Sequence, residues 1–254
     1  MFHRELIDKG KTHGATLRSQ SPGARPSKVA ADNSKRPGPA SKPAVSLYGN
    51  KPVKLRAKSL VAPRILGVGS STGGPQALLE FFGTLKNSIK VPIVITQHMP
   101  PTFTTILAEH ISGVMGADCH EGIDGEEVLP GKVYLAPGDN HMVLKSVGTK
   151  TFISLNQGPQ ANFCRPSVDP LFDSMAEIYG AASLLVILTG MGHDGRDGSR
   201  KVVDAGGTLI AQDEPTSVVW GMPGAVATAG ICHQVLPLKK IAPTVLSFFG
   251  GARR

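Results

Sequence analysis

The chain has 254 residues, of which 41% are hydrophobic, and this length suits either one large α/β domain with a tail or two small domains. No apolar run approaches the roughly 18 residues that a membrane-spanning helix needs, and the charged N-terminus has no secretory signal. The three cysteines form no CxxC pair and no plausible disulfide framework. We therefore expect a soluble cytoplasmic protein that is not inserted in a membrane.

The net charge of +8 is confined to the N-terminal quarter of the chain. Residues 1–64 contain 14 Lys/Arg and 3 Asp/Glu, whereas residues 65–254 contain 13 Lys/Arg and 16 Asp/Glu. The remaining three quarters are thus slightly acidic, which argues against a nucleic-acid-binding function for the folded part. We favour a solvated linker over a binding segment as the interpretation of the basic tail.

Composition divides the chain into three parts. Residues 12–61 are rich in Pro, Ser, Ala, Lys and Arg and have neither a helical nor a strand period, so we expect a basic disordered linker. Residues 1–11 differ, because Phe2 and Leu6 stand one helical turn apart and suggest a short amphipathic helix. Residues 62–254 are expected to form the folded domain.

Strands and helices alternate along this domain. A buried strand is expected at 65–69, followed by a helix at 75–85 with Pro75 in its first turn. Further strands are expected at 91–96, 128–136, 141–155, 184–188 and 208–211, and helices at 102–114, 166–179, 198–205 and 237–249. This alternation predicts a modified doubly wound α/β fold, with a mostly parallel sheet and helices on both faces. Residues 128–136 and 141–155 suggest a small antiparallel insertion.

Three predicted strands end in polar, reactive residues. The first runs into Ser71, the second into His98, and the strand at 184–188 into a glycine-rich turn with Asp194. Ligands of doubly wound sheets bind beyond the carboxyl ends of the strands, so these three side chains are expected to converge there.

The serine stands in a G-x-S-x-G sequence, Gly69 to Gly73. In that pattern the nucleophile occupies a tight turn between a strand and a helix, where backbone N–H groups can stabilise an oxyanion. The alternative is an ordinary turn in which Ser71 only caps the helix.

His98 is a candidate general base, and Asp194 is the candidate partner that would hold its tautomer. His193 competes for the role of base, but it is adjacent to Asp194, so both cannot easily point into one site. A structural histidine and a turn-forming aspartate are the alternatives. A metal site of His98, His193 and Asp194 is disfavoured because it lacks ligand spacing such as H-x-x-x-H.

A dinucleotide site is a rival interpretation of Gly67 and Gly69. It is disfavoured because Thr72 replaces the third glycine and the second strand ends in Gln97-His98 rather than near an acidic residue. A Walker-type phosphate loop is weaker still, since no Gly-Lys-Ser/Thr follows.

These motifs together resemble the catalytic domain of the chemotaxis protein-glutamate methylesterases (CheB). The resemblance covers about residues 62–249 and rests on a set of segments in one order: Gly-Ser-Ser71-Thr-Gly-Gly-Pro, Gln-His98-Met-Pro, Ala-Pro-Gly-Asp-Asn-His141, Arg165-Pro-Ser-Val-Asp169, Gly-Met191-Gly-His-Asp194-Gly, Gln212-Asp213 and Gly221-Met222-Pro223.

The resemblance implies a serine hydrolase acting in chemotaxis adaptation. It implies Ser71 as nucleophile, His98 as base, Asp194 as the partner of that base, and oxyanion stabilisation by the Met191 N–H with Thr72 adjacent. The implied substrates are glutamate γ-methyl esters of methyl-accepting chemoreceptors, with deamidation of receptor glutamines as a further activity. No cofactor and no metal are implied, and we expect a monomer.

Two departures from the family pattern affect the expectation. His193 stands where family members often have Asn. The usual N-terminal receiver domain is missing, although residues 1–11 resemble the last helix of one, so we expect either a truncated chain or a lost receiver. An inactive scaffold that binds signalling proteins, and a hydrolase for an unrelated ester or amide, remain as alternatives.

Overall fold

The computed structural model describes residues 53–250. The expected helix in residues 1–11 and most of the expected linker lie outside this range. In the part described, no helix is long and apolar enough to cross a membrane.

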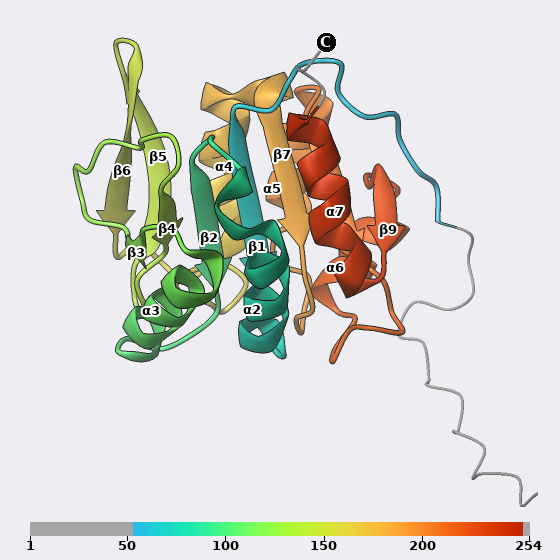
Figure 1. Ribbon diagram of the computed structural model, residues 1–254, viewed down its shortest axis with the longest axis horizontal. Helices are drawn as coiled ribbons and strands as arrows, with labels where there is room; N and C mark the ends of the chain where they lie inside the picture. The colour runs from blue at the N-terminus through green and yellow to red at the C-terminus, as the bar shows by residue number, and fades with distance from the viewer. Residues whose placement is uncertain (1–52, 251–254) are drawn as a thin grey trace, which may run out of the picture. The chain divides into compact units, whose positions relative to one another are not determined.

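The centre of the fold is a seven-stranded parallel sheet with the order β3-β4-β2-β1-β7-β8-β9 (Figure 1). Strands β1, β2, β7 and β8 are buried along their whole length, as near-continuous apolar runs predict for a sheet covered on both faces. The strands are β1 Ile65–Ser70, β2 Ile93–Gln97, β3 Cys119–Glu121, β4 Val133–Leu135, β7 Ser183–Ile187, β8 Thr208–Gln212 and β9 Gln234–Leu236.

Helices cover both faces of the sheet, which confirms the doubly wound α/β prediction. One face carries α2, α3 and α7, and the other carries α4, α5 and α6 (Figure 1). The helices are α2 Gly74–Leu85, α3 Phe103–Met115, α4 Val168–Ile178, α5 Arg196–Asp204, α6 Met222–Thr228 and α7 Leu238–Phe249, with short 3-10 turns at Lys86–Ser88 and Gly180–Ala182.

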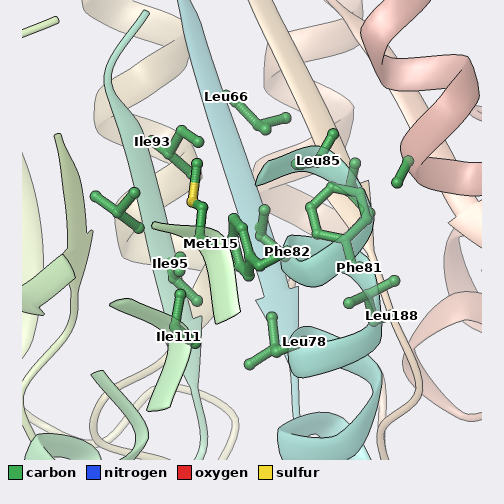
Figure 2. Close-up of a cluster of buried hydrophobic side chains, with 14 of the residues drawn as sticks. Leu66, Leu78, Phe81, Phe82, Leu85, Ile93, Ile95, Ile111, Met115 and Leu188 are labelled. Carbon is green, nitrogen blue, oxygen red and sulfur yellow. The ribbon is translucent and has the colours of Figure 1, made fainter. Parts of the chain in front are cut away.

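The core under α2 is built from large apolar side chains. Figure 2 shows Phe81 and Phe82 of α2 in one cluster with the strand residue Leu66 and the α3 residue Ile111. The two phenylalanine rings meet edge to face with centroids 5.0 Å apart, a favourable arrangement of aromatic quadrupoles. This packing fixes α2, whose N-terminus adjoins Ser71.

Helix α4 lies very close to β1 on the opposite face. A Cβ atom added at Gly67 would lie 2.8 Å from the Met175 sulfur, and one added at Gly69 would lie 2.7 Å from Cγ1 of Val168. These glycines therefore permit close packing of helix on strand, which accounts for them without a dinucleotide. The same packing brings the N-terminus of α4 to the edge where β1 ends.

The antiparallel insertion is a hairpin of β5, His141–Val147, and β6, Lys150–Asn156. The prediction of an extended strand throughout 128–136 was wrong. Only Val133–Leu135 forms a strand, and it is parallel and belongs to the main sheet. Pro130 has no backbone N–H for a ladder, and Gly131 at φ 80° turns the chain, so the strand cannot extend further back.

The connections leaving β1 and β7 define a topological switch point. Beyond β1 the sheet continues on one side through β2, β4 and β3. Beyond β7 it continues on the other side through β8 and β9. The carboxyl ends of β1 and β7 flank the crevice where such sheets bind ligands. Ser71 follows β1 directly.

Residues 53–61, the last part of the expected linker, are described by the structure. They contain no helix or strand, and they lie along the folded domain. The Arg56 backbone donates a hydrogen bond to the Cys232 carbonyl at 2.8 Å, and the Ser59 backbone donates one to Oγ1 of Thr208 at 2.8 Å. The ammonium of Lys58 lies 5.4 Å from the ring centroid of Phe248. We call residues 53–61 the strap.

Candidate active site

Ser71 is held where β1 and β7 end. Its backbone N–H donates to the Thr189 carbonyl at 3.0 Å, which ties the turn to the end of β7. The turn is completed by Gly73 at φ 77°, a left-handed conformation that costs glycine little. Gly190 allows the two strand ends to meet, because a Cβ there would lie 2.9 Å from Cβ of Ser71.

Gln97 joins the strand end that carries Ser71 to the one that carries His98. Its side-chain amide donates to the carbonyls of Ser71 and His98, both at 3.0 Å, and its oxygen accepts from Ser70 Oγ at 2.7 Å. Gln97 was not among the side chains predicted to belong to the site. Gln97 is buried beside two strand ends, which only the fold brings together. The position therefore suits a side chain that both donates and accepts hydrogen bonds.

Two backbone N–H groups are available at the turn. Within residues 53–250, neither the Thr72 N–H nor the Met191 N–H forms a hydrogen bond. Thr72 directly follows Ser71. Met191 directly follows Gly190, where an added Cβ would lie 2.9 Å from Cβ of Ser71. A strand-to-helix turn with unpaired amides is the usual construction of an oxyanion hole.

His98 lies against Asp194. Its Nε2 atom is 2.6 Å from Oδ2 of Asp194, whose side chain is buried. His193, the competitor for the role of base, is exposed. Among the residues described, no group of three or more His, Cys, Asp or Glu could hold a metal ion.

The Asp194 carboxylate is surrounded by donors. Oδ2 also accepts from the backbone of Val168 at 2.6 Å, and Oδ1 accepts from four further groups: the side chains of Asn162 and Ser167 and the backbones of Asp169 and Gly195. Val168 is the first residue of α4, so the carboxylate also lies at the positive end of a helix dipole.

These contacts favour the ion pair of Asp194 and His98. Burial opposes the charge on Asp194, but hydrogen bonds from His98 and the Val168 backbone outweigh it and lower the pKa to about 2. Burial likewise opposes the charge on His98, but its contacts with Asp194 and Cys164 raise the pKa to about 9. At neutral pH the resting imidazole is therefore protonated.

The other ring nitrogen of His98 contacts a cysteine. Sγ of Cys164 lies 3.3 Å from Nδ1, whereas the hydrogen bond expected between Ser71 and His98 is not formed within residues 53–250. The three predicted residues thus converge on one sheet edge, but in this structure Cys164 lies next to the ring nitrogen of His98 that faces away from Asp194. Sequence analysis treated Cys164 only as one of three unpaired cysteines.

Asp169 is a second carboxyl beside Asp194 that sequence reasoning did not assign. Burial raises its pKa, the Gly198 N–H lowers it, and the Asp194 charge raises it, to about 6 overall. Its oxygens accept from the Gly198 backbone at 2.7 Å and from Asn162 at 2.8 Å. Asp169 therefore belongs to the network that surrounds the His98–Asp194 pair.

Residues 66–245 match the family model described as CheB methylesterase. The chain belongs to this family. It is 45% identical to the crystallised CheB methylesterase catalytic domain of Thermotoga maritima, with a TM-score of 0.71, and the match covers 74% of this chain and 99% of that one.

Curated relatives in this family extend beyond the chain. It is 51% identical to protein-glutamate methylesterase/protein-glutamine glutaminase 1 of Paramagnetospirillum magneticum, over 100% of this chain and 66% of the relative. It is 50% identical to a protein-glutamate methylesterase/protein-glutamine glutaminase of Azospirillum brasilense, over 99% of this chain and 64% of the relative. The chain thus spans slightly less than two thirds of the length of these relatives.

Proposed function

We propose that this chain is a serine hydrolase that removes methyl groups from glutamate γ-methyl esters of chemoreceptors, with receptor glutamines as amide substrates. The observation that carries the proposal is the convergence of Ser71 with the His98–Asp194 pair at the switch point of the sheet. Its family membership and the names of its relatives support the choice of substrate.

In the proposed reaction, neutral His98 takes the Ser71 hydroxyl proton on Nδ1 while Nε2 stays bonded to Asp194. The Ser71 oxygen attacks the γ-carbonyl carbon and the carbonyl oxygen becomes an oxyanion. The N–H groups of Thr72 and Met191 are the proposed donors to that oxyanion.

Collapse of the intermediate breaks the bond to the methoxy group, which receives the proton from His98 and leaves as methanol. Water then loses a proton to His98 and attacks the glutamyl ester on Ser71. The bond between the acyl carbon and the Ser71 oxygen breaks, His98 returns the proton to that oxygen, and glutamate is released. With glutamine as substrate, ammonia leaves in place of methanol. Every proton in this scheme passes through His98, so the scheme uses no cofactor.

Chemoreceptors are the proposed partners, and the cytoplasm is the proposed place of reaction. The unpaired thiols of Cys119, Cys164 and Cys232 agree with a reducing compartment. An inactive scaffold is less well supported, because nothing in its role would require a buried carboxylate paired with a histidine beside an accessible serine.

The test is release of labelled methanol from receptor-containing membranes whose glutamates carry a labelled methyl ester. We expect release by the wild-type chain and none above background by Ser71→Ala. Ammonia release from receptors carrying unmodified glutamines tests the amide activity in parallel. Hydrolysis of a simple ester without release from receptors would mean that the substrate class is wrong, although the chemistry is right.

A further inference from the structure

A four-residue turn contacts the His98–Asp194 pair at both of its ends. Ala161 and Cys164 exchange two backbone hydrogen bonds, of 3.2 and 2.9 Å, and close the turn. The two residues between them have positive φ, 52° at Asn162 and 62° at Phe163. Two consecutive left-handed residues make this a tight turn of the kind that normally uses glycine.

The left-handed backbone is unfavourable here. Asparagine tolerates it, but a bulky residue such as phenylalanine adopts it only rarely, because its side chain crowds the backbone there. Phe163 obtains no burial in return, since 93% of it is exposed. The turn is therefore held by its two backbone hydrogen bonds and by the side-chain contacts of Asn162 and Cys164.

Asn162 reaches the acidic end of the pair. Its side-chain amide donates to Oδ1 of Asp194 and to Oδ2 of Asp169, both at 2.8 Å. A neutral group that donates to both carboxylates holds them side by side without adding charge. Asp194 is thus fixed in the orientation that presents its other oxygen to His98.

Cys164 reaches the basic end of the pair. Its sulfur lies 3.3 Å from Nδ1 of His98, the nitrogen opposite the one that Asp194 holds. With both nitrogens engaged, the ring has one orientation. The nitrogen that faces Cys164 is the one that must take the Ser71 proton in the proposed reaction.

We propose that the Ala161–Cys164 turn is a positioning element of the active site, in which Asn162 orients Asp194 and Cys164 holds the free nitrogen of His98. The proposal rests on the proposed function only in taking His98 as the base. The two positioning residues act on the rate in different ways, and this makes them separable.

Loss of the Asn162 amide removes a donor from Asp194 and lets the carboxylate rotate, so kcat falls. Loss of the Cys164 thiol removes an interaction that favours protonated His98, so the base becomes neutral at lower pH. The titratable groups that face His98 are Asp194 and Cys164, and Asp169 acts on it through Asp194.

The experiment uses glycine at adjacent positions, because glycine suits the left-handed backbone at both. Asn162→Gly deletes the amide, whereas Phe163→Gly leaves both contacts in place and serves as the control. With a small activated ester, we expect kcat to fall roughly 10- to 100-fold in Asn162→Gly with KM within about twofold, because a misplaced partner costs this much. Phe163→Gly should keep kcat within about twofold.

Cys164→Ala is tested by the pH profile of kcat/KM for the same ester. We expect the midpoint of the acid limb to move to lower pH by at least about 0.5 unit, which raises the rate at pH 7 about threefold. Cys164→Ser should move it less, because a hydroxyl still reaches Nδ1.

Equal kcat in Asn162→Gly and Phe163→Gly, or an unmoved acid limb in Cys164→Ala, would overturn the proposal. The rate of fluorophosphonate labelling of Ser71 in the same variants separates this failure from failure of the proposed function. If the wild type is labelled and the variants are labelled at the same rate, the positioning role alone is refuted. Absence of labelling in the wild type would refute the proposed function instead.

Discussion

In the proposed mechanism, the protonation state of the His98 side chain determines the pH at which the chain can act. Its contacts with Asp194 and Cys164 outweigh burial and hold the pKa near 9. Only the neutral imidazole can accept the Ser71 proton, so the reactive fraction of the free enzyme grows with pH up to that value.

We therefore expect log kcat/KM for a small ester to rise with a slope near one between about pH 7 and pH 9. Ser71→Ala, measured at each pH, supplies the correction for spontaneous hydrolysis. A plateau that already begins near pH 6.5, the ordinary value for histidine, would mean that Asp194 and Cys164 do not hold the proton on His98 in the free enzyme.

The same ion pair contributes to stability within a defined pH window. The folded Asp194 pKa of about 2 lies below its ordinary value of 3.8, so its contribution is present above 3.8 and is lost as pH falls toward 2. The folded His98 pKa of about 9 lies above 6.5, so its contribution is complete below 6.5 and is lost as pH rises through 9. The pair therefore stabilises the folded state most between about pH 3.8 and pH 6.5.

Between pH 6.5 and 9.5, the free energy of unfolding of the wild type should fall by about 2–3 kcal/mol more than that of Asp194→Asn, from the size of the His98 shift. Urea denaturation at several pH values measures this difference. His98→Asn should flatten the same window, because it removes the other member of the pair. Parallel curves for wild type and both variants would contradict the account.

At the scale of elements, the turn between β1 and α2 fixes the position of Ser71, the proposed nucleophile. Gly73 has φ 77°, and a Cβ added there would lie 2.6 Å from Cβ of Val218. Gly113, in the last turn of α3, provides a comparison, because an added Cβ there meets no described atom within 4 Å.

We expect Gly73→Ala to destabilise the fold by about 2 kcal/mol or more, since strain and overlap add, and to reduce esterase activity. Gly113→Ala should stabilise the fold by at most about 0.5–1 kcal/mol with activity unchanged, because alanine is the better helix former but the position lies in the last turn. Thermal unfolding and ester hydrolysis, measured on both variants, test this. Full activity in Gly73→Ala would show that the turn does not set the position of Ser71.

Elements of ten or more residues with a clear period could be predicted from the sequence. Helices α2, α3 and α7 begin and end within a residue or two of the predicted bounds. The sequence analysis missed β3, α6 and β9, which have 3, 7 and 3 residues. Elements this short have no period of their own and form because the sheet and its neighbours complete them.

The site shows the same limit at the level of single residues. Ser71, His98 and Asp194 could be selected because each follows an apolar strand, and parallel strands end at one edge. Asn162 and Cys164 could not, since they reach the pair through a turn whose left-handed backbone no local pattern predicts. Asp169 was quoted in a motif, but its role depends on the burial it shares with Asp194.

At the scale of the chain, the structure assigns the strap to the domain. Removal of residues 1–52 should leave kcat/KM for a small ester within about twofold, because residues 53–250 contain Ser71, His98 and Asp194 together with the groups described as holding them. Removal of residues 1–61 also deletes the backbone donors at Arg56 and Ser59, so unfolding should become easier by about 1–3 kcal/mol. Purified deletion variants, compared by urea denaturation and ester hydrolysis, test both statements. Equal stability of the two would show that the strap contributes nothing.

The claim that Ser71 is the nucleophile of this fold is tested most directly by mapping a fluorophosphonate adduct. Ser70 is the matched comparison, because its hydroxyl is buried and bonded to Gln97. We predict a single adduct on Ser71 in the wild type and in Ser70→Ala, and none in Ser71→Ala or His98→Ala, with all four proteins folded by circular dichroism. An adduct on Ser70 or Cys164, or labelling that persists in Ser71→Ala, would contradict the account.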